Sequence, residues 1–228
     1  MTTTSDAPHP VGLRHRSLKS ELIDQIRLDI VQGRLKPGER LIERVLSERY
    51  EVSRVPLREA MLRLEAEGFL TLAPRRGATV ATFTVEGVED LFDVREQLEA
   101  LAARLAAERA NPESLAVLGR ALSESEEATA ADDRERRSSS NAHFHESIID
   151  MAGSPLLSSI MLPIGARVRW LFGFMSSSES PTLLSEHRRL LELIGGGEAA
   201  AASEFARAHV AATRKHTLDS LAELIHHG

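Results

Sequence analysis

Residues 52–60 read VSRVPLREA, and this run has the features of a helix start. Ser53 is a favoured residue at the N-cap position of a helix. Pro56 would lie in the first turn, where its missing backbone N–H costs little. Leu57 and Ala60, with the apolar residues that follow at helical spacing, would face inward. The run therefore predicts a helix that begins at Ser53 and ends near Gly68.

Two further helices are expected before this run. Apolar residues recur every four positions over 18–30, which predicts a first helix with one buried stripe, and Pro37-Gly38 forces a turn. A short second helix is expected over 43–50, with Val45 among its buried residues. Two helices joined by a tight turn form the geometry that places the N-terminus of a recognition helix in the major groove of DNA.

Basic side chains accompany these helices. Arg54 and Arg58 are four residues apart, so both point to one side of the recognition helix, beside its buried stripe. There they could contact guanine edges or phosphates, and Arg44, one turn into the preceding helix, could do the same. An arginine on a surface helix is usually only solvated. The combination of helices, turn and arginines is what favours DNA binding.

A basic loop between two strands completes this region. Residues 69–72 and 78–81 read as strands around the sequence Pro-Arg-Arg-Gly at 74–77. The loop resembles a wing with a basic tip, whose glycine lets the backbone approach the duplex closely. We therefore expect a flexible tail over residues 1–14 and a winged helix-turn-helix DNA-binding domain over residues 15–82.

Charge is divided unevenly along the chain. The net charge of −6 is unusual for a nucleic-acid-binding protein. Residues 1–82, however, hold 14 Lys and Arg against 11 Asp and Glu, a net charge of +3, whereas residues 83–228 hold 14 against 23, a net charge of −9. A basic head on an acidic body is expected where one domain meets phosphate and the other does not.

The head closely resembles the DNA-binding domain of the GntR family of bacterial transcriptional regulators. The pattern of that family is G-x-L-x-P-G-x-x-L, then V-S-R-x-P-x-R-E-A-L-x-x-L-x-x-E-G-L and a wing glycine. It is matched across residues 18–81, with Met61 and Phe69 in place of leucine. Carried over position by position, the resemblance implies DNA contacts at Arg44, Ser53, Arg54, Pro56, Arg58, Arg76 and Gly77.

From residue 85 onward, helical patterns replace strand signals. Helices are expected over 86–109, 113–130, 133–152, 155–175, 182–195 and 198–225. The fold class is therefore mainly α, with an all-α effector-binding and dimerisation domain over residues 83–228. No apolar run could cross a bilayer and the N-terminal segment has no apolar signal core, so we expect a cytoplasmic protein. The absence of cysteine excludes disulfides and thiolate metal sites.

Three histidines lie on the apolar stripes of separate helices in this domain: His145, His187 and His209. A single inward histidine is more often a hydrogen-bonded core residue than a ligand. Three on separate helices, with Asn141 one turn before His145, can converge on one divalent ion as three nitrogens and one oxygen. Positions would then stay open for water or an effector. His143 is expected to face solvent.

The same region resembles the FCD ligand-binding domain of FadR-type GntR regulators. The metal pattern of that domain is Asp or Asn, then Phe-His, later Glu-His, and finally His on the last helix. Here these positions read Asn141, Phe144-His145, Glu186-His187 and Ala208-His209. The resemblance implies a zinc, nickel or manganese ion held by Asn141, His145, His187 and His209. Asn141 replaces the commoner Asp, so this site carries one less negative charge.

Two arginines of the bundle also fall on apolar stripes. Arg95 lies on the stripe of Leu91 and Leu98, and Arg167 lies on the stripe that includes Ile164. Each could form an ion pair with a carboxylate of the bundle. Each could instead bind a ligand carboxylate in a bidentate manner, which the resemblance implies beside the metal. We expect Arg95 to be an effector-binding residue and Arg167 to be a second clamp.

These features together predict a homodimeric transcriptional regulator, most simply a repressor, that binds a palindromic DNA operator and is controlled by a small carboxylate. Two alternatives stay open: a metal-dependent hydrolase or lyase fused to a DNA-binding head, and a regulator that responds to the metal alone. No inward carboxylate one turn from the predicted ligands is a clear general base, so we expect the chain not to be an enzyme.

Overall fold

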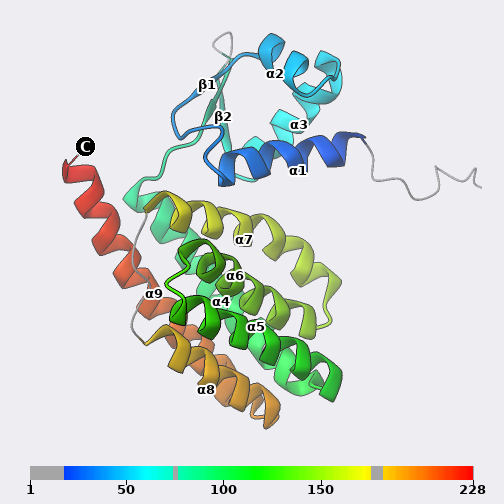
Figure 1. Ribbon diagram of the computed structural model, residues 1–228. Helices are drawn as coiled ribbons and strands as arrows, with labels where there is room; N and C mark the ends of the chain where they lie inside the picture. The colour runs from blue at the N-terminus through cyan, green and yellow to red at the C-terminus, as the bar shows by residue number, and fades with distance from the viewer. Residues whose placement is uncertain (1–17, 74–76, 176–181, 228) are drawn as a thin grey trace, which may run out of the picture.

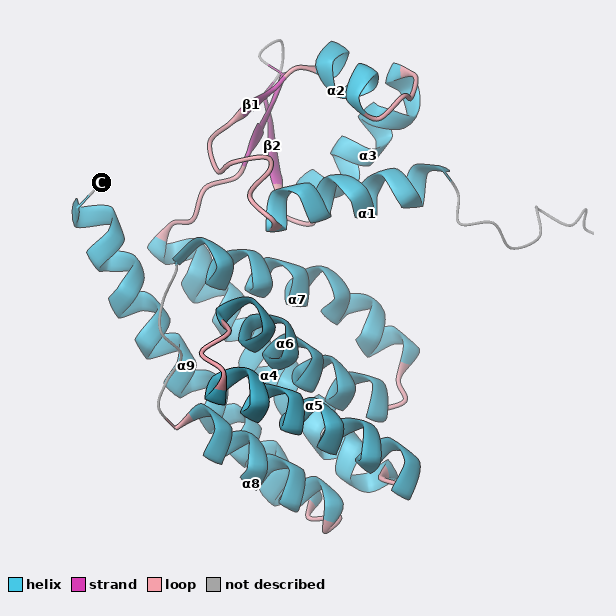
Figure 2. Cartoon of the chain, in the orientation of Figure 1, coloured by secondary structure: helices cyan, strands magenta, loops and turns pink. Residues whose placement is uncertain are grey.

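The computed structural model describes residues 18–73, 77–175 and 182–227, and it divides into a small head and a larger helical body (Figure 1). The head contains α1, α2, α3 and a small sheet, and the body contains α4 to α9. Every strand among the described residues lies in the head, and helices make up most of the rest (Figure 2). The architecture confirms the predicted fold class.

Three helices form the head: α1 (Leu18–Val31), α2 (Glu43–Arg49) and α3 (Arg54–Ala66). Helix α1 buries the predicted stripe except for Leu18, which is 59% exposed at the start of the helix. The turn after α1 depends on Gly38, whose φ of 77° favours glycine. The expected burial of Val45 was wrong, because its side chain is 45% exposed. Helix α2 is short, about two turns long, and Leu46 is its one buried residue.

The sheet of the head has three antiparallel strands in the order β1-β3-β2. Strand β2 (Leu70–Ala73) pairs with β3 (Gly77–Val80) and forms the two sides of the predicted wing. The tip of the wing, residues 74–76, lies outside the described residues. The sequence analysis missed β1 (Arg40–Leu41), which pairs with β3. Two residues are too few to show the alternation that identifies a strand.

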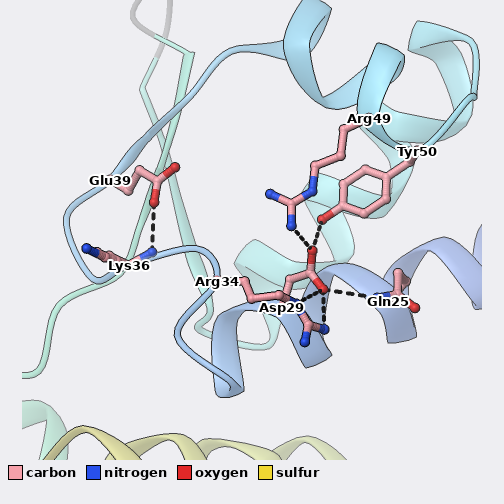
Figure 3. Close-up of polar contacts among 7 residues, drawn as sticks. All are labelled: Gln25, Asp29, Arg34, Lys36, Glu39, Arg49 and Tyr50. Atoms are coloured by element: carbon pink, nitrogen blue, oxygen red, sulfur yellow. Dashed lines mark hydrogen bonds and ion pairs between the residues drawn. The ribbon is translucent and has the colours of Figure 1, made fainter.

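A buried carboxylate holds the helices of the head together. Asp29 of α1 accepts hydrogen bonds from Gln25, Arg34, Arg49 and Tyr50 (Figure 3). Burial alone would raise the pKa of Asp29, but the hydrogen bonds from Arg34, Tyr50 and Gln25 and the charge of Arg49 outweigh it and lower the pKa. Because Arg49 and Tyr50 stand at the end of α2, the network fixes α2 against α1.

Six helices form the body: α4 (Val85–Arg109), α5 (Pro112–Ala130), α6 (Arg134–Met151), α7 (Pro155–Met175), α8 (Leu183–Gly195) and α9 (Ala199–His227). Side-chain caps define several starts: Thr84 accepts from the backbone N–H of Gly87, and Asn111 forms a capping box with Ser114. Within the described ranges, no helix combines the length and apolar content that a membrane span needs.

Helix α7 packs against both parts of the molecule. It runs directly beneath α1 (Figure 1), and its residues Ala166 and Trp170 join the buried core of the head. The ring centroid of Trp170 lies 5.6 Å from that of Phe69 and 4.3 Å from that of Phe83. The head and the body therefore meet through packed apolar side chains as well as through the chain connection between β3 and α4.

Candidate functional site

The start of α3 lies on the exposed surface of the head. Ser53 occupies the N-cap position in an extended conformation, as predicted, but its side chain makes no capping hydrogen bond. The hydroxyl is exposed and is not committed to the helix. Pro56 is half-buried in the first turn. The N-terminus of a helix favours anions, so this end of α3 is suited to a phosphate.

The predicted DNA-binding arginines surround this helix start. Arg58 donates from Nε to both carboxylate oxygens of Glu43 at 2.9 Å, and this contact raises the pKa of Arg58. Arg44 pairs with Glu48 at 2.8 Å, and Arg54 is exposed. Ion pairs that are exposed to solvent in this way are weak. A phosphate or a base edge could therefore replace the carboxylate partners.

The wing lies on the same domain. Gly77 begins β3 with an exposed backbone and a φ of 85°, which is a conformation that favours glycine. The neighbouring Arg76 falls outside the described residues. The predicted DNA contacts that the structure describes are therefore at α2, at the start of α3 and at the base of the wing.

In the body, the three predicted histidines meet. They come from α6, α8 and α9, and one ring nitrogen from each of His145, His187 and His209 lies within 4.8 Å of the other two. His187 and His209 are buried, and His145 is partly buried. His143 is exposed, as the sequence analysis expected. The three imidazoles are close enough to serve a single ion.

Orphaned polar atoms support a cation at this point. Both ring nitrogens of His187 and Oδ1 of Asn141 are buried and make no hydrogen bond with the described residues. A buried polar group without a partner costs about 1–3 kcal/mol. Burial and the nearby His145 and His209 lower the pKa of His187 well below its usual value, so its imidazole is neutral. Three imidazoles and an amide oxygen are a donor set that fits a divalent first-row metal.

Two carboxylates orient the histidines: Glu186, which belongs to the predicted pattern but had no role assigned to it, and Glu99, which was not predicted from the sequence. Oε2 of Glu186 lies 2.6 Å from Nδ1 of His209, and Oε2 of Glu99 lies 3.1 Å from Nδ1 of His145. A carboxylate on one ring nitrogen fixes the orientation of an imidazole and leaves the other nitrogen for a metal. The hydrogen bond with His209 lowers the pKa of Glu186 despite partial burial. Both were visible as acidic residues, Glu186 adjoining a predicted ligand and Glu99 one turn after Arg95.

Arg95 both pairs with this cluster and faces open space. Its Nε donates to Oε1 of Glu99 at 2.8 Å, and its guanidinium lies 4.6 Å from the ring centroid of Phe92. Burial raises the pKa of Glu99, but the nearby Arg95 and His145 outweigh burial and hold that pKa well below its ordinary value. Nη1 of Arg95 is buried and makes no hydrogen bond with the described residues. One part of this arginine is therefore structural and another is left for a ligand.

A cavity of about 640 Å³ opens beside these groups. Arg95, Glu99, Asn141, His145 and His209 line it from α4, α6 and α9, and a long face of α7 forms another wall. His187 stands behind the other two histidines and stacks on Phe144 at 4.2 Å between ring centroids. The size is typical of a small-molecule site.

The structure does not bring Arg167 into this cavity, so its expected role as a second clamp is corrected. Its guanidinium packs against the head, 3.1 Å from the position that a β-carbon on Gly68 would take. The apolar stripe misplaced Arg167 because α7 has two buried faces, one on the cavity and one on the head. Arg169 lines the cavity instead and pairs with Glu146 of α6.

Known proteins match both parts of the chain. The family model for bacterial regulatory proteins of the gntR family matches residues 18–80, and the FCD domain model matches residues 90–212. The HTH-type transcriptional regulator YdhC of Bacillus subtilis (strain 168) is 30% identical over 212 residues, which cover 91% of this chain and 92% of YdhC. The HTH-type transcriptional repressor GlaR of Escherichia coli (strain K12) is 31% identical over 198 residues, covering 81% of this chain and 89% of GlaR.

A solved structure shares the fold. The structure of E. coli McbR/YncC matches with a TM-score of 0.76 and 24% sequence identity, and the match covers 91% of this chain and 100% of that chain. These relatives are transcriptional regulators and not enzymes, in agreement with the sequence analysis.

Proposed function

Because the chain belongs to the GntR family of bacterial regulatory proteins and carries an FCD domain, it is a transcriptional regulator, and we propose that it is a repressor controlled by a small organic acid. We further propose that it acts in the cytoplasm as a homodimer, whose two winged heads bind the half-sites of a palindromic operator. The name of GlaR, which describes a repressor, supports this direction of control.

A divalent metal is part of the proposal. The orphaned nitrogens of His187 and the orphaned oxygen of Asn141 support it, and His145 and His209 complete the donor set. Zinc, nickel and manganese all suit imidazole nitrogen with one oxygen ligand. When bound, the ion supplies positive charge and open coordination positions. Glu99 and Glu186 hold His145 and His209 in place for it.

The organic acid is proposed to bind between the metal site and Arg95. Arg95, whose buried Nη1 has no hydrogen-bond partner among the described residues, lines the cavity together with Asn141, His145 and His209. A guanidinium binds a carboxylate by charge-assisted hydrogen bonds, and a buried arginine with an unused nitrogen is suited to this.

The position of α7 is the observation that supports a coupling between ligand binding and DNA binding. One face of this helix, which includes Gly165 and Val168, lines the cavity, and the opposite face, which includes Ala166 and Trp170, belongs to the core of the head. A ligand that shifts α7 would move the head with it, because packed cores shift between discrete arrangements and do not deform continuously. In a dimer, a change in the angle between heads would forfeit contacts at both half-sites.

Thermal unfolding of metal-loaded protein tests this function. Protein stripped of metal is loaded with zinc, nickel or manganese and incubated with a panel of carboxylic acids, while product formation is followed in parallel. A reversible rise in melting temperature without product is the expected result, and linkage gives about 2.7 kcal/mol of stabilisation at 100 times the Kd. Turnover of an acid would indicate an enzyme. A change in operator binding with metal alone, unaffected by every acid, would indicate a metal-responsive regulator.

A further inference from the structure

We propose that the acid is a monocarboxylate with an apolar body, and that this body lies along α7 over Gly165. The inference rests on the proposed function, since it assigns the chemistry of the ligand in the same cavity. The proposed ligand has one carboxyl group, which binds at the Arg95 end of the cavity. The rest of the ligand is uncharged hydrocarbon and lies along α7.

The size and lining of the cavity exceed what a short polar acid would fill. Sites for drug-sized molecules have volumes of about 300–1,000 Å³, and the cavity of about 640 Å³ lies within this range. Its polar lining includes Arg95 and two of the histidines and, on α7, Ser158, Ser159 and Arg169. Most of the α7 wall is apolar and includes Met161, Leu162, Val168 and Phe172. Leu162 is 61% exposed there, so an apolar ligand would remove hydrocarbon surface from water.

Gly165 keeps this wall open. It lies inside α7, where glycine costs roughly 0.5–1 kcal/mol relative to alanine. Its backbone does not require glycine, because Gly165 is not among the glycines with positive φ. A β-carbon at this position would meet no described side chain or distant backbone atom within 4 Å, and Gly165 lines the cavity. The missing side chain therefore leaves room in the cavity that the fold itself does not use.

The charges around the cavity favour a single carboxylate. Its lining includes the cations Arg95 and Arg169 and the anions Glu99, Glu146 and Asp150, a net charge of −1 when the metal-binding imidazoles are counted as neutral. A divalent ion would raise this to +1, which one carboxylate neutralises. A dicarboxylate or tricarboxylate would add negative charge near the partly exposed Glu146 and the exposed Asp150, and like charges repel each other.

A chain-length series measures the apolar body. Acetate, butanoate, hexanoate, octanoate and decanoate are titrated into zinc-loaded full-length protein by calorimetry, with succinate and citrate as polar acids of comparable size to butanoate and hexanoate. We expect the affinity to rise about fourfold for each methylene that is covered, and the two polyacids to bind more weakly than butanoate. An affinity that stays flat along the series would overturn the proposal, and so would tightest binding by succinate or citrate.

Two glycine variants test the position of the body. Gly165→Leu should weaken octanoate binding by roughly 5- to 150-fold, since overpacking costs 1–3 kcal/mol, and should leave acetate almost unchanged. Gly119→Leu is the matched control, because Gly119 lies inside α5 with equally open space and does not line the cavity. Equal effects of both variants on octanoate would overturn the assignment to Gly165.

These experiments distinguish an error in the proposed ligand class from an error in the proposed control by an organic acid. If succinate or citrate binds in an Arg95-dependent manner and the fatty acids do not, the ligand class is wrong and the proposed control by an acid survives. If none of the acids binds to protein loaded with any of the three metals, both proposals fall.

Discussion

At Arg58, a carboxylate of the protein occupies the place that DNA is proposed to take. Glu43 holds the guanidinium on the exposed surface beside the start of α3, and Glu48 does the same for Arg44. These pairs orient long side chains at small cost, because exposed ion pairs are weak. A phosphate or a guanine edge can therefore displace the carboxylate without a large penalty.

Replacing Arg58 tests the DNA-binding face. We expect Arg58→Ala to weaken operator binding by about 1–3 kcal/mol, because a base or phosphate contact is lost. Fluorescence anisotropy with an operator selected from random duplexes measures the change. Arg104→Ala, which removes an exposed arginine paired with Glu108 in the body, is the matched control. Equal affinities of Arg58→Ala and the wild type would remove Arg58 from the interface.

Replacing His187 tests the metal site. His187→Ala removes a buried imidazole that has no hydrogen-bond partner among the described residues, and we expect it to lower the bound metal per chain. Elemental analysis after dialysis measures the stoichiometry, with circular dichroism as the check on folding. His143→Ala alters an exposed histidine of α6 and should leave the stoichiometry unchanged. Full metal content in His187→Ala would show that His187 is not a ligand.

Replacing Asp29 tests the network of the head. We expect Asp29→Asn to lower the stability of the head by about 1–3 kcal/mol, because bonds to a charged acceptor are lost. The folded pKa of Asp29 is lowered, so its contribution is complete above the unfolded pKa of about 3.9 and is lost as the pH falls through the folded pKa. The wild type should thus approach the variant in stability below pH 4. A constant difference in unfolding free energy down to pH 2 would contradict this account.

At the scale of elements, α7 is shared between the cavity and the head. Its two faces lie on opposite sides of one helix, so a displacement caused at Val168 is also felt at Trp170. The aromatic rings of Phe69, Phe83 and Trp170, which are in direct contact, would transmit it under the proposed function. No flexible linker has to carry the signal in this arrangement.

Removing the ring of Trp170 tests this role. We expect Trp170→Ala to keep acid binding in the body but to reduce the effect of the acid on operator affinity, which in coupled proteins is typically 1–3 kcal/mol. Calorimetry for the acid and anisotropy for the operator separate the two effects. Leu118→Ala, a buried truncation in α5, controls for lost stability. Unchanged coupling in Trp170→Ala would exclude α7 as the route.

The elements that sequence predicted well are those with long or distinctive patterns. Apolar periodicity and breaks placed the body helices within two residues of their observed bounds, and the histidine stripes identified three histidines that lie close together in the structure. Strand β1 was missed because it has two residues. Arg167 was assigned to the cavity because a stripe shows that a face is buried but does not show which neighbour buries it. The contact between Trp170 and the head was missed for the same reason.

At the scale of the whole molecule, the head and the body differ in net charge and are proposed to bind different ligands. Residues 1–82 carry a net charge of +3, whereas residues 83–228 carry a net charge of −9 and would repel the phosphate backbone. The logarithm of operator affinity should therefore fall steeply and linearly with the logarithm of salt concentration, whereas acid binding beside the buried Arg95 should change less. Equal salt sensitivity of the two affinities would contradict this division.

The central claim is that the cavity and the operator are linked through one protein. In zinc-loaded protein, operator affinity is measured with and without saturating octanoate, and octanoate affinity is measured with and without saturating operator. The account predicts that octanoate weakens operator binding and that operator weakens octanoate binding by the same factor. An acid that raises the melting temperature of the protein and leaves operator affinity unchanged would contradict it.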